Sequence, residues 1–427
     1  MALFPPPADS SFDIGEGISF PDPDIMETGH VPVDAYTSEA RFELERELFG
    51  KVWLCMGREH QVPNPGDWIV RDIECRSASV IIVRGKDMKV RAFHNICSHR
   101  GMKLVWDKKG RGGKFSCPYH AWLYDAQGDL AHIPDEGCFA HVDKKESGLT
   151  PIHCDNWEGF VFINLDPSPA QTLREFLGPL ADRLSDAPFA GYTHTLALSQ
   201  PVSGNWKLGI EAASEGYHVA ALHTQSVGGM ISTKQNPHVN FLAWEPLGPH
   251  RNATIPCNPD YRLPARRIVQ RFASANGQQM MVEGGAEGNA SCEFLHHPAI
   301  NRIKTPIFGN EQFNLFPNFS IHITVNGFWT TSYWPISKGK SSWLTTYYYK
   351  PPVSCREEFS LHVNGALQRD IFAEDNSCFQ KQQAMLESGA KKFVQFGESE
   401  ILLRHLVGVI AGIENNRNDE GYRIAAE

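Results

Sequence analysis

Two short segments each combine a cysteine with a histidine, and they constrain the fold of this chain more than any other feature. The first reads Cys97-Ser98-His99 and the second reads Cys117-Pro118-Tyr119-His120, with seventeen residues between the two pairs. Two thiols and two imidazoles can hold a metal group only if the chain brings both segments together. Short β runs flank both segments, and tight loops between strands present ligands at fixed angles. The sequence therefore predicts a metal site at two neighbouring loops.

Each pair contains one cysteine and one histidine, and this combination helps to distinguish between the metal groups that the site could hold. A [2Fe–2S] cluster with two cysteines on one iron and two histidines on the other takes one residue of each type from each loop. A structural zinc ion is also satisfied by two cysteines and two histidines, but zinc fingers usually pair cysteine with cysteine and histidine with histidine. A chance arrangement of a core cysteine and a surface histidine is the remaining alternative. The pairing favours the iron–sulfur cluster.

The β runs around these segments indicate a small all-β domain. Val, Ile and aromatic residues at 68–70, 79–83, 90–93 and 160–165 are separated by turn residues, which predicts short strands. Residues 1–36 are rich in Pro, Gly and Asp and are expected to form an extended arm, followed by a helix at 38–49. We expect an arm and helix over 1–51 that pack on the larger domain, the cluster domain over 52–166, and the larger domain over 167–427.

The larger domain alternates helical and β patterns. Helices are expected at 170–184 and 202–219, and strands at 312–324, 327–335 and 343–349 in one antiparallel sheet. Two amphipathic helices are expected at 356–389 and 398–413. The whole chain is therefore predicted to be α+β, with an antiparallel sheet covered by helices in the larger domain.

Charge and composition exclude several classes of partner. The 427 residues include 40 Lys and Arg against 49 Asp and Glu, a net charge of -9 that argues against nucleic acid or anionic membranes as general partners. No apolar run is long enough for a membrane span, and the start of the chain does not have the pattern of a signal peptide. The ten cysteines form no dense framework, so free thiols or metal ligands are expected in a cytoplasmic protein.

A second candidate metal site lies in the stretch from Asn205 to His223. His218, His223 and one carboxylate would make the two-histidine, one-carboxylate triad that holds Fe(II) with open positions for other ligands. In a straight helix, two side chains five residues apart point about 140° apart around the helix axis, which is too far for them to share a metal easily. We therefore expect the helix to end, kink or open between Val219 and Leu222.

The first motif resembles the Rieske domain of ring-hydroxylating oxygenases. The resemblance rests on the Cys/His pairs together with Arg100-Gly101, Tyr119 and Trp122. Rieske electron carriers of quinol-oxidising complexes are similar, but they add one cysteine in each loop and a membrane anchor. Gly101, Met102 and Tyr119 stand at the corresponding positions here, so the oxygenase class is favoured.

The second stretch is similar to the catalytic motif of the same family, which begins with Asn-Trp-Lys and ends in Tyr-His and a further histidine. The resemblance implies that His218 and His223 are iron ligands. The family's third ligand is an aspartate in a C-terminal helix, and the best match is Asp375, with the neighbouring Glu374 as the alternative.

Glu215 stands at the place of the family's bridging acid, which links the iron site of one subunit to the cluster of the next. Carried over, Glu215 would connect His218 to His120 of an adjacent subunit in a homotrimer. Two departures from the family pattern occur: the acid is usually Asp, and Ala212 replaces the usual Asn. The glutamate resembles a subset of oxygenases that act on quaternary ammonium compounds.

The resemblance implies a terminal oxygenase with a [2Fe–2S] cluster and Fe(II), acting on O2 and an apolar small molecule, with aromatic compounds as the leading class. Electrons would come from a ferredoxin or flavin reductase, because the chain has no Gly-rich dinucleotide motif. Monohydroxylation, dihydroxylation and oxidative demethylation stay open. The alternatives are an oxygenase for quaternary ammonium or N-alkyl substrates, a non-catalytic electron-transfer protein, and a zinc-stabilised binding module.

The substrate pocket is expected in the β section of the larger domain. Alternate residues of a strand face opposite sides of the sheet, so about half of the candidates should be core. The candidates are Phe313, Leu315, Phe316, Asn318, Phe328 and Trp329.

Overall fold

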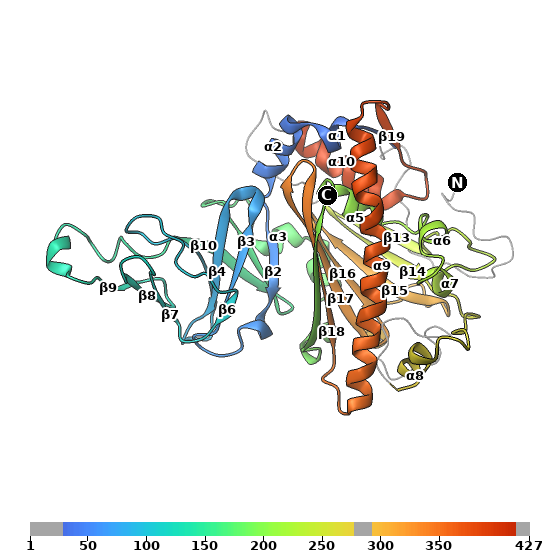
Figure 1. The fold of residues 1–427 in the computed structure, drawn as a ribbon, viewed down its shortest axis with the longest axis horizontal. Coiled ribbons are helices and arrows are strands. Elements are labelled where there is room, and N and C mark those ends of the chain that lie inside the picture. Colours follow the sequence, from blue (N-terminus) through green and yellow to red (C-terminus); the bar gives the residue numbers. More distant parts are fainter. Residues whose placement is uncertain (1–28, 277–292, 416–427) are drawn as a thin grey trace. The chain divides into compact units, whose positions relative to one another are not determined.

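The structure is a computed structural model that describes residues 29–276 and 293–415. These residues form two compact units, which can be followed by colour in Figure 1. Residues 43–176 make up the smaller unit, and residues 29–42 join the described residues from 177 onward in the larger one. Helices and antiparallel sheets are both present, which confirms the predicted α+β class.

Seven antiparallel strands form the main sheet of the smaller unit, in the order β2-β11-β10-β5-β4-β3-β6. The strands predicted at 68–70, 79–83, 90–93 and 160–165 correspond to β3, β4, β5 and β11. In the centre, Ile81 and Ile82 are both fully buried, so β4 is covered on both of its faces. The strands are Leu54–Arg58 (β2), Trp68–Ile73 (β3), Ala78–Arg84 (β4), Val90–His94 (β5), Lys109–Gly110 (β6), Pro151–Trp157 (β10) and Phe160–Asn164 (β11).

A small three-stranded sheet lies at one end of this unit (Figure 1). It consists of β7 (Lys114–Ser116), β8 (Leu123–Asp125) and β9 (Leu130–His132). One hydrophobic core joins it to the main sheet, and both Cys97 and Cys117 are part of that core. The loops that carry the two Cys/His pairs are therefore anchored at their first residue.

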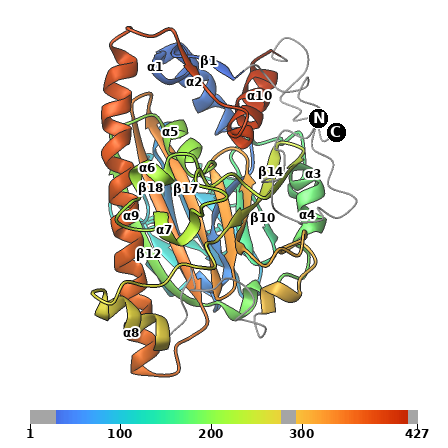
Figure 2. The same cartoon turned by 90° about the vertical axis from the view of Figure 1, so that its right-hand side faces the viewer.

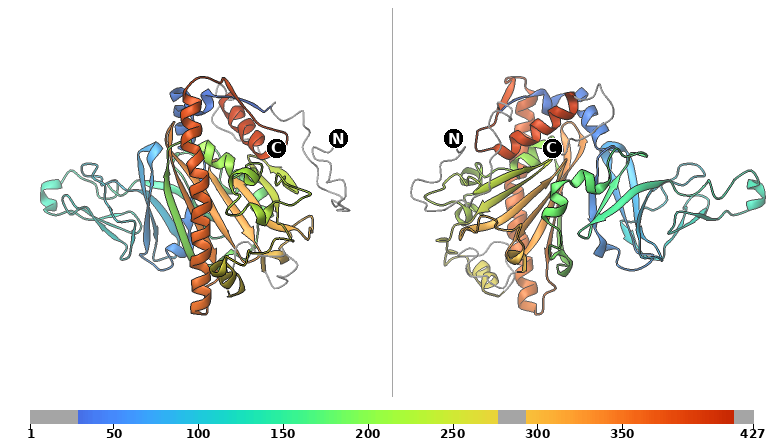
Figure 3. Two further views of the ribbon diagram at one scale, coloured as in Figure 1. Left: turned by 45° about the vertical axis from the view of Figure 1, so that its right-hand side comes forward. Right: turned by 180° about the vertical axis from the view of Figure 1, so that it is seen from behind.

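The larger unit is built on a second seven-stranded antiparallel sheet, in the order β12-β18-β17-β16-β15-β14-β13. The 33-residue helix α9 (Cys355–Glu387) runs along this sheet, as Figures 2 and 3 show from three directions. The strands are His194–Val202 (β12), Ala243–Leu247 (β13), His250–Pro256 (β14), Phe308–Leu315 (β15), Phe319–Thr324 (β16), Gly327–Ser337 (β17) and Lys340–Tyr349 (β18).

Helix α9 buries one stripe of residues spaced three or four apart. Side chains at that spacing lie on one face of a helix. The stripe is half polar, which is unusual for a helix packed on a sheet and marks the face that carries Asp375. Its buried members include Leu361, Asn364, Gln368, Ile371, Asp375, Phe379 and Gln383.

The single strand predicted over 312–324 is wrong. The structure has a hairpin there, with β15 ending at Leu315 and β16 beginning at Phe319. Pro317 has no backbone N–H, so a strand hydrogen-bonded on both sides cannot continue through it. Asn318 completes the turn by donating from Nδ2 to the carbonyl oxygen of Tyr333 at 3.1 Å.

Two predicted helices are shorter than expected. The stretch 170–184 contains α3 (Leu173–Leu177) and α4 (Pro179–Arg183), separated by Gly178 with a φ of +50°. The stretch 202–219 begins with the last residue of β12, and its helix α5 covers only Trp206–Ala212. The side chain of Asn205 caps α5 by accepting a hydrogen bond from the Lys207 N–H, which explains why the helix begins there.

The helices predicted at 38–49, 356–389 and 398–413 are confirmed as α2 (Glu39–Leu48), α9 and α10 (Ile401–Asn415). Residues 1–28 of the predicted arm lie outside the described residues. The rest of that arm is not extended throughout, because it contains the helical turn α1 (Asp34–Thr37) after β1 (His30–Pro32), which pairs with β19 (Phe393–Gln395). The shorter helices are α6 (Val219–Leu222), α7 (Gly228–Ile231) and α8 (Ile268–Asn276). Within the described chain, no helix combines the length and apolar character needed to cross a bilayer.

Candidate metal centres

The two Cys/His segments fold into loops with the same backbone hydrogen bonds. Each loop has six residues, Cys97–Met102 and Cys117–Trp122. The N–H of the first residue donates to the carbonyl of the last at 2.8 Å in both loops, and the N–H of the fifth donates to the carbonyl of the first at 3.0 and 2.9 Å. The fifth residue has a positive φ in each, +71° at Gly101 and +57° at Ala121. A glycine in a sequence suggests a residue with positive φ, so the first turn could be predicted, whereas an alanine gives no such indication for the second.

The loops bring the four candidate ligands together with the thiols inside and the imidazoles further out. Cys97 and Cys117 are buried, while His99 and His120 are partly exposed and their ring centroids lie 4.7 Å apart. Trp122 stacks on the His99 ring with the planes 7° apart. The Nδ1 atom of His120 is buried without a hydrogen-bond partner. A buried ring nitrogen in that state is expected when it binds a metal, so the donor set fits a cluster.

The spacing of these four side chains also separates a cluster from zinc. Ligands of one tetrahedral zinc ion lie about 2.0–2.3 Å from the metal, and hence within about 4 Å of one another. Among the described residues, the four do not form a group in which three ligand atoms lie within 4.8 Å of each other. Ligands divided between two irons do not need to meet that condition.

Tyr124 contacts the inner side of the first loop. Its hydroxyl lies 3.3 Å from the Cys97 Sγ and accepts a hydrogen bond from the Ser98 N–H at 3.0 Å. Burial raises the pKa of the Cys97 thiol, and the neighbouring Cys117 raises it further. Two thiolates in this core therefore need a cation to stabilise them.

The second candidate centre begins where α5 ends. Residues 213–217 leave the helix, and α6 then forms one short turn with His218 before it and His223 after it. The expected break between Val219 and Leu222 is therefore misplaced, because those residues are the helical turn itself. The chain leaves the helix on either side of them, and His223 has φ −94° and ψ 28°. This geometry allows two histidines five residues apart to face each other.

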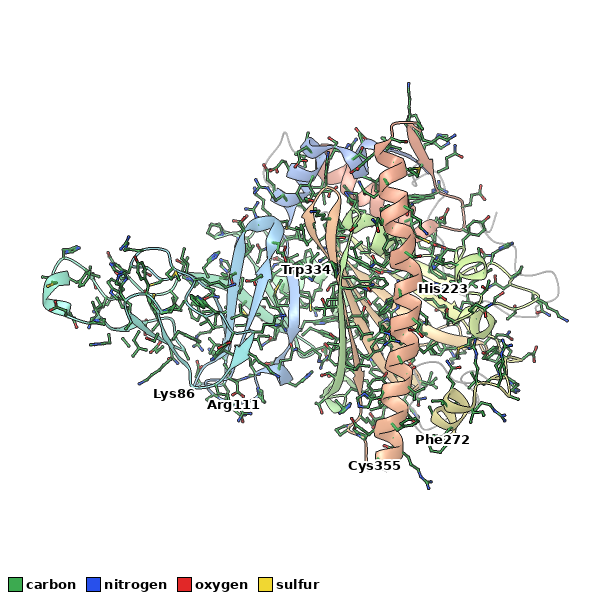
Figure 4. The ribbon with its side chains drawn as sticks, in the orientation of Figure 1. Lys86, Arg111, His223, Phe272, Trp334 and Cys355 are labelled. Atoms are coloured by element: carbon green, nitrogen blue, oxygen red, sulfur yellow. The ribbon has the colours of Figure 1, made fainter. Side chains whose placement is uncertain are left out.

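His218, His223 and Asp375 converge on one point. The Nε2 atoms of the two histidines lie 3.2 Å apart. The Oδ1 atom of Asp375 lies 3.1 Å from Nε2 of His223 and 3.6 Å from Nε2 of His218. It is buried and makes no hydrogen bond of good geometry. Three such atoms within 4.8 Å of one another are the spacing of ligands around one metal ion, and the residues present fit one. Figure 4 labels His223 beside α9.

A separate carboxylate contacts the outer nitrogen of each ring. Glu215 contacts Nδ1 of His218 through Oε1, and its Oε2 accepts a hydrogen bond from the His218 N–H at 3.1 Å. Glu374 lies 2.6 Å from Nδ1 of His223. Burial lowers the pKa of His223, but the carboxylates of Asp375 and Glu374 outweigh it, so the pKa lies above its ordinary value. This surrounding negative charge suits a cation between the rings.

The face of the sheet towards α9 carries aromatic and polar residues. Cross-strand partners share a face, and Trp329 lies opposite His322 and Tyr347. Tyr347 donates from its hydroxyl to Gln368 of α9 at 3.0 Å, which fixes this face as the one towards the helix. Phe372, one helical turn before Asp375, packs on Trp343 with ring centroids 4.2 Å apart. The candidate metal site therefore lies next to a wall of aromatic side chains, which consists of Trp329, Trp343, Tyr347 and Phe372.

The predicted pocket residues divide between the two faces. Trp329 lies on the face towards α9. Phe328 lies on the opposite face, in an aromatic core with Phe189 and Phe294. Glu311 of β15 pairs with Ile323, and Ile323 pairs with Phe328, so these three residues lie on one face of the sheet. Phe313 and Leu315 follow Glu311 at every second position and therefore lie on the same face. Phe316 and Asn318 lie in the hairpin turn. This placement favours a core role for Phe313, Leu315 and Phe328, and a pocket role for Trp329.

Several polar residues on the face towards α9 were missed at the sequence level. Gln312 lies opposite His322, and Asn314 lies opposite Ser320. Buried atoms of two of them, Oε1 of Gln312 and Nδ2 of Asn314, have no hydrogen-bond partner. The available signal was the polar Asn310, Gln312 and Asn314 at every second position of β15, although Glu311 interrupts the apolar residues at the alternate positions.

Comparisons with known proteins agree with this geometry. Residues 189–413 match the family model "Ring hydroxylating alpha subunit (catalytic domain)", and residues 52–145 match "Rieske [2Fe-2S] domain". The first match covers more than half of the 427 residues.

The chain belongs to the α subunits of ring-hydroxylating oxygenases. Its two matched domains are those that carry a [2Fe–2S] cluster and a mononuclear iron centre in this family.

Relatives in this oxygenase family act on different compounds, as their names state. The oxygenase subunit of carnitine monooxygenase from Escherichia coli K12 is 33% identical over 203 residues, 46% of this chain and 53% of that protein. The large subunit of anthranilate 1,2-dioxygenase from Acinetobacter baylyi is 34% identical over 228 residues, 50% of this chain and 48% of that protein. The aligned part of this chain thus spans about half the length of these relatives.

Solved structures of Rieske oxygenases share the fold. Naphthalene 1,2-dioxygenase from Rhodococcus sp. gives a TM-score of 0.71 at 19% identity, covering 91% of this chain and 95% of that one. A quaternary ammonium Rieske monooxygenase gives a TM-score of 0.68 at 20% identity, covering 89% and 95%.

Proposed function

We propose that this chain is the terminal oxygenase component of a multicomponent oxygenase. In this proposal two sets of residues hold the metals. The [2Fe–2S] cluster is held by Cys97, His99, Cys117 and His120. Fe(II) is held by His218, His223 and Asp375.

One observation carries the proposal above the others. Three potential ligand atoms, two from the residues that flank α6 and one from α9, converge within 4.8 Å, and the outer nitrogen of each imidazole already contacts a carboxylate. An electron-transfer protein would keep the Cys/His loops but would have no need of this second arrangement. A zinc-stabilised binding module would need neither the second arrangement nor mixed Cys/His loops.

The chain's own residues prepare the second site for catalysis. When bound, Fe(II) would supply the oxygen-activating redox chemistry, and three protein ligands leave positions around it open. Glu215 and Glu374 accept the Nδ1–H of the two imidazoles, which leaves both Nε2 lone pairs directed at the metal position. Phe372, Trp329 and the neighbouring tyrosines would exclude water and present an apolar substrate beside Asp375.

Electrons would reach the cluster from a separate ferredoxin or flavin reductase and then pass to the iron of a neighbouring copy in a homotrimer. Glu215 would link His218 to His120 of that neighbouring copy, using lone pairs left on the same two carboxylate oxygens. Such a carboxylate fixes two ring orientations at once and shortens the path between the metals. The cytoplasmic location expected from the sequence stays a prediction.

The proposed substrate is an apolar small molecule, with aromatic compounds as the leading class because the α9-facing wall is aromatic. A second candidate is a quaternary ammonium or N-alkyl compound. It is supported by Glu215 at the bridging position and by the similarity to carnitine and glycine betaine monooxygenase subunits. Aromatic rings also bind such cations, so the wall is compatible with both classes.

A single-turnover experiment under ¹⁸O2 tests the proposal. The reduced holoprotein is mixed with a panel of arenes, aromatic ethers, benzoates and N-methylated amines, and the products are analysed by mass spectrometry. We expect at least one compound to gain ¹⁸O, or to lose a methyl group as formaldehyde that carries the label when it is trapped quickly. If the cluster is reoxidised by O2 and no compound in a broad panel is changed, the electron-transfer alternative is favoured.

A further inference from the structure

Glu374 and Asp375 are adjacent acids on α9, yet they contact opposite nitrogens of one imidazole. Consecutive residues of a helix point about 100° apart, and here the His223 ring lies between them. Asp375 Oδ1 is 3.1 Å from Nε2, and Glu374 Oε2 is 2.6 Å from Nδ1. The two acids therefore cannot have the same role at this ring, because only Nε2 faces His218.

Glu374 is itself fixed by the loop that follows His223. The Ser226 hydroxyl donates to the same Oε2 atom of Glu374 at 2.5 Å. Ser226 is buried, and the Gly228 N–H donates to the His223 carbonyl at 2.9 Å, which closes the loop. A Cβ atom at Gly228 would lie 2.8 Å from that carbonyl oxygen, so the tight turn requires glycine. The loop thus fixes the Ser226 hydroxyl within hydrogen-bonding distance of the Glu374 carboxylate.

We propose that Glu374 is a positioning residue for the metal site rather than a ligand, and that Ser226 holds it in place. The inference rests on the proposed function, since it assumes that His223 binds Fe(II). Glu374 accepts the Nδ1–H of His223, which fixes the tautomer whose Nε2 lone pair faces the metal and raises the basicity of the ring. The second imidazole has the same arrangement with Glu215. Each histidine of the site therefore has its own carboxylate, one from the α5–α6 connection and one from α9.

An outer carboxylate of this kind typically changes metal affinity by about 10–100-fold. We expect Glu374→Ala to weaken Fe(II) binding by about that factor, Glu374→Gln by less because the amide oxygen still accepts the Nδ1–H, and Ser226→Ala by the least. Asp375→Asn should weaken Fe(II) binding more than any of them. Asp370→Asn is the matched control, because Asp370 is an exposed acid one turn earlier on α9 whose carboxylate contacts the Arg369 guanidinium.

The experiment uses full-length holoprotein with the cluster intact. A chelator removes the mononuclear iron, and Fe(II) is titrated back under anaerobic conditions. The dissociation constant and the EPR spectrum of the Fe(II)–nitric oxide adduct are measured, with the visible absorption of the cluster and the Tm as folding controls. A positioning role predicts an altered EPR spectrum in Glu374→Ala and partial recovery in Glu374→Gln. A purely structural role would lower the Tm and leave the EPR spectrum of bound iron unchanged.

Wild-type affinity and an unchanged EPR spectrum in both Glu374 variants would overturn the inference. So would complete loss of Fe(II) binding in Glu374→Gln together with retention in Asp375→Asn, which would exchange the two roles. If the chelated wild-type protein took up no Fe(II) at all, the proposed function itself would fail, and this inference with it. If Glu374→Ala did not fold, Ser226→Ala and Glu374→Gln would still decide the question.

Discussion

The smaller and the larger unit each contain a pair of histidines, and the two pairs are held in opposite ways. His99 and His120 contact each other and aromatic rings, with Trp122 stacked on His99. His218 and His223 face each other through Nε2 and have a carboxylate at each Nδ1. The first pair is held mainly by its loops and by stacking, and the second pair by acids.

The difference appears in the charge that each site favours. Desolvation, His120 and Arg100 together lower the pKa of His99, which favours the neutral imidazole. At His223 the carboxylates of Asp375 and Glu374 outweigh burial and raise the pKa. Neutral imidazoles suit a cluster whose charge is already balanced by thiolates, whereas a site rich in carboxylates suits a lone divalent cation. The same residue type can therefore be prepared for two kinds of metal group by a change in its neighbours.

Removing one proposed ligand from each site should separate the two sites completely. We expect His218→Ala to abolish turnover while the visible absorption of the cluster stays intact, because the two sites share no ligand. Cys117→Ala should do the reverse, removing the absorption while Fe(II) still binds at the other site. Iron analysis, absorption spectra and product formation check both variants. Retained turnover in His218→Ala would remove that residue from the iron site.

A smaller effect is expected when a carboxylate of the second pair is neutralised. Glu215→Gln should keep both metals, because no proposed ligand is lost and the amide oxygen can still accept the Nδ1–H of His218. It should slow electron transfer between the cluster and the iron, by about 10–100-fold if the effect is typical of outer carboxylates. Rapid-mixing kinetics of cluster reoxidation in a single turnover provide the measurement. A normal rate would show that Glu215 does not connect the two centres.

The last effect is on stability rather than on activity, and it concerns a buried histidine that has no carboxylate partner among the described residues. His322 is buried and stacks on Trp329, and burial lowers its pKa to about 3. The unfolded-state pKa is about 6.5, so His322 favours the fold fully above that pH, and this contribution is lost as the pH falls towards 3. Between pH 7 and pH 4 the free energy of unfolding decreases by about 3 kcal/mol, because each pKa unit corresponds to about 1.36 kcal/mol.

His322→Phe should remove that part of the pH dependence. Denaturant unfolding at pH 7 and pH 4 would measure it as a smaller decrease in the free energy of unfolding for the variant than for the wild type. His60 and His405, whose burial also lowers their pKa values, remain in both proteins and contribute equally. An identical decrease in both proteins would mean that His322 is not held neutral in the fold.

The first site could be predicted from the sequence because its ligands are local. Cys97 and His120 lie within a stretch of 24 residues, and the mixed pairs are distinctive. The small strands of that unit were also visible, because apolar residues cluster between turn residues. What stayed hidden was the second loop's left-handed Ala121, since only glycine signals that conformation in a sequence.

The second site was less visible because its parts come from distant segments. Glu215 precedes His218 by three residues, but Glu374 and His223 are 151 residues apart. Helical spacing predicted that the helix is interrupted but not where, because the chain leaves the helix on both sides of α6, which is only one turn long. On the sheet, the strand prediction over 312–324 ignored Pro317, and with it the hairpin that decides which residues face α9. Tertiary contacts, rather than local preference, settled each of these points.

The most direct test of this comparison is the iron and acid-labile sulfide content of purified holoprotein, measured together with zinc. We expect three irons and two sulfides per chain, with one iron removed by a chelator that leaves the visible spectrum unchanged. Two irons and two sulfides, with no further Fe(II) taken up by the chelated protein, would contradict the second site. A colourless protein that contains zinc would contradict the first.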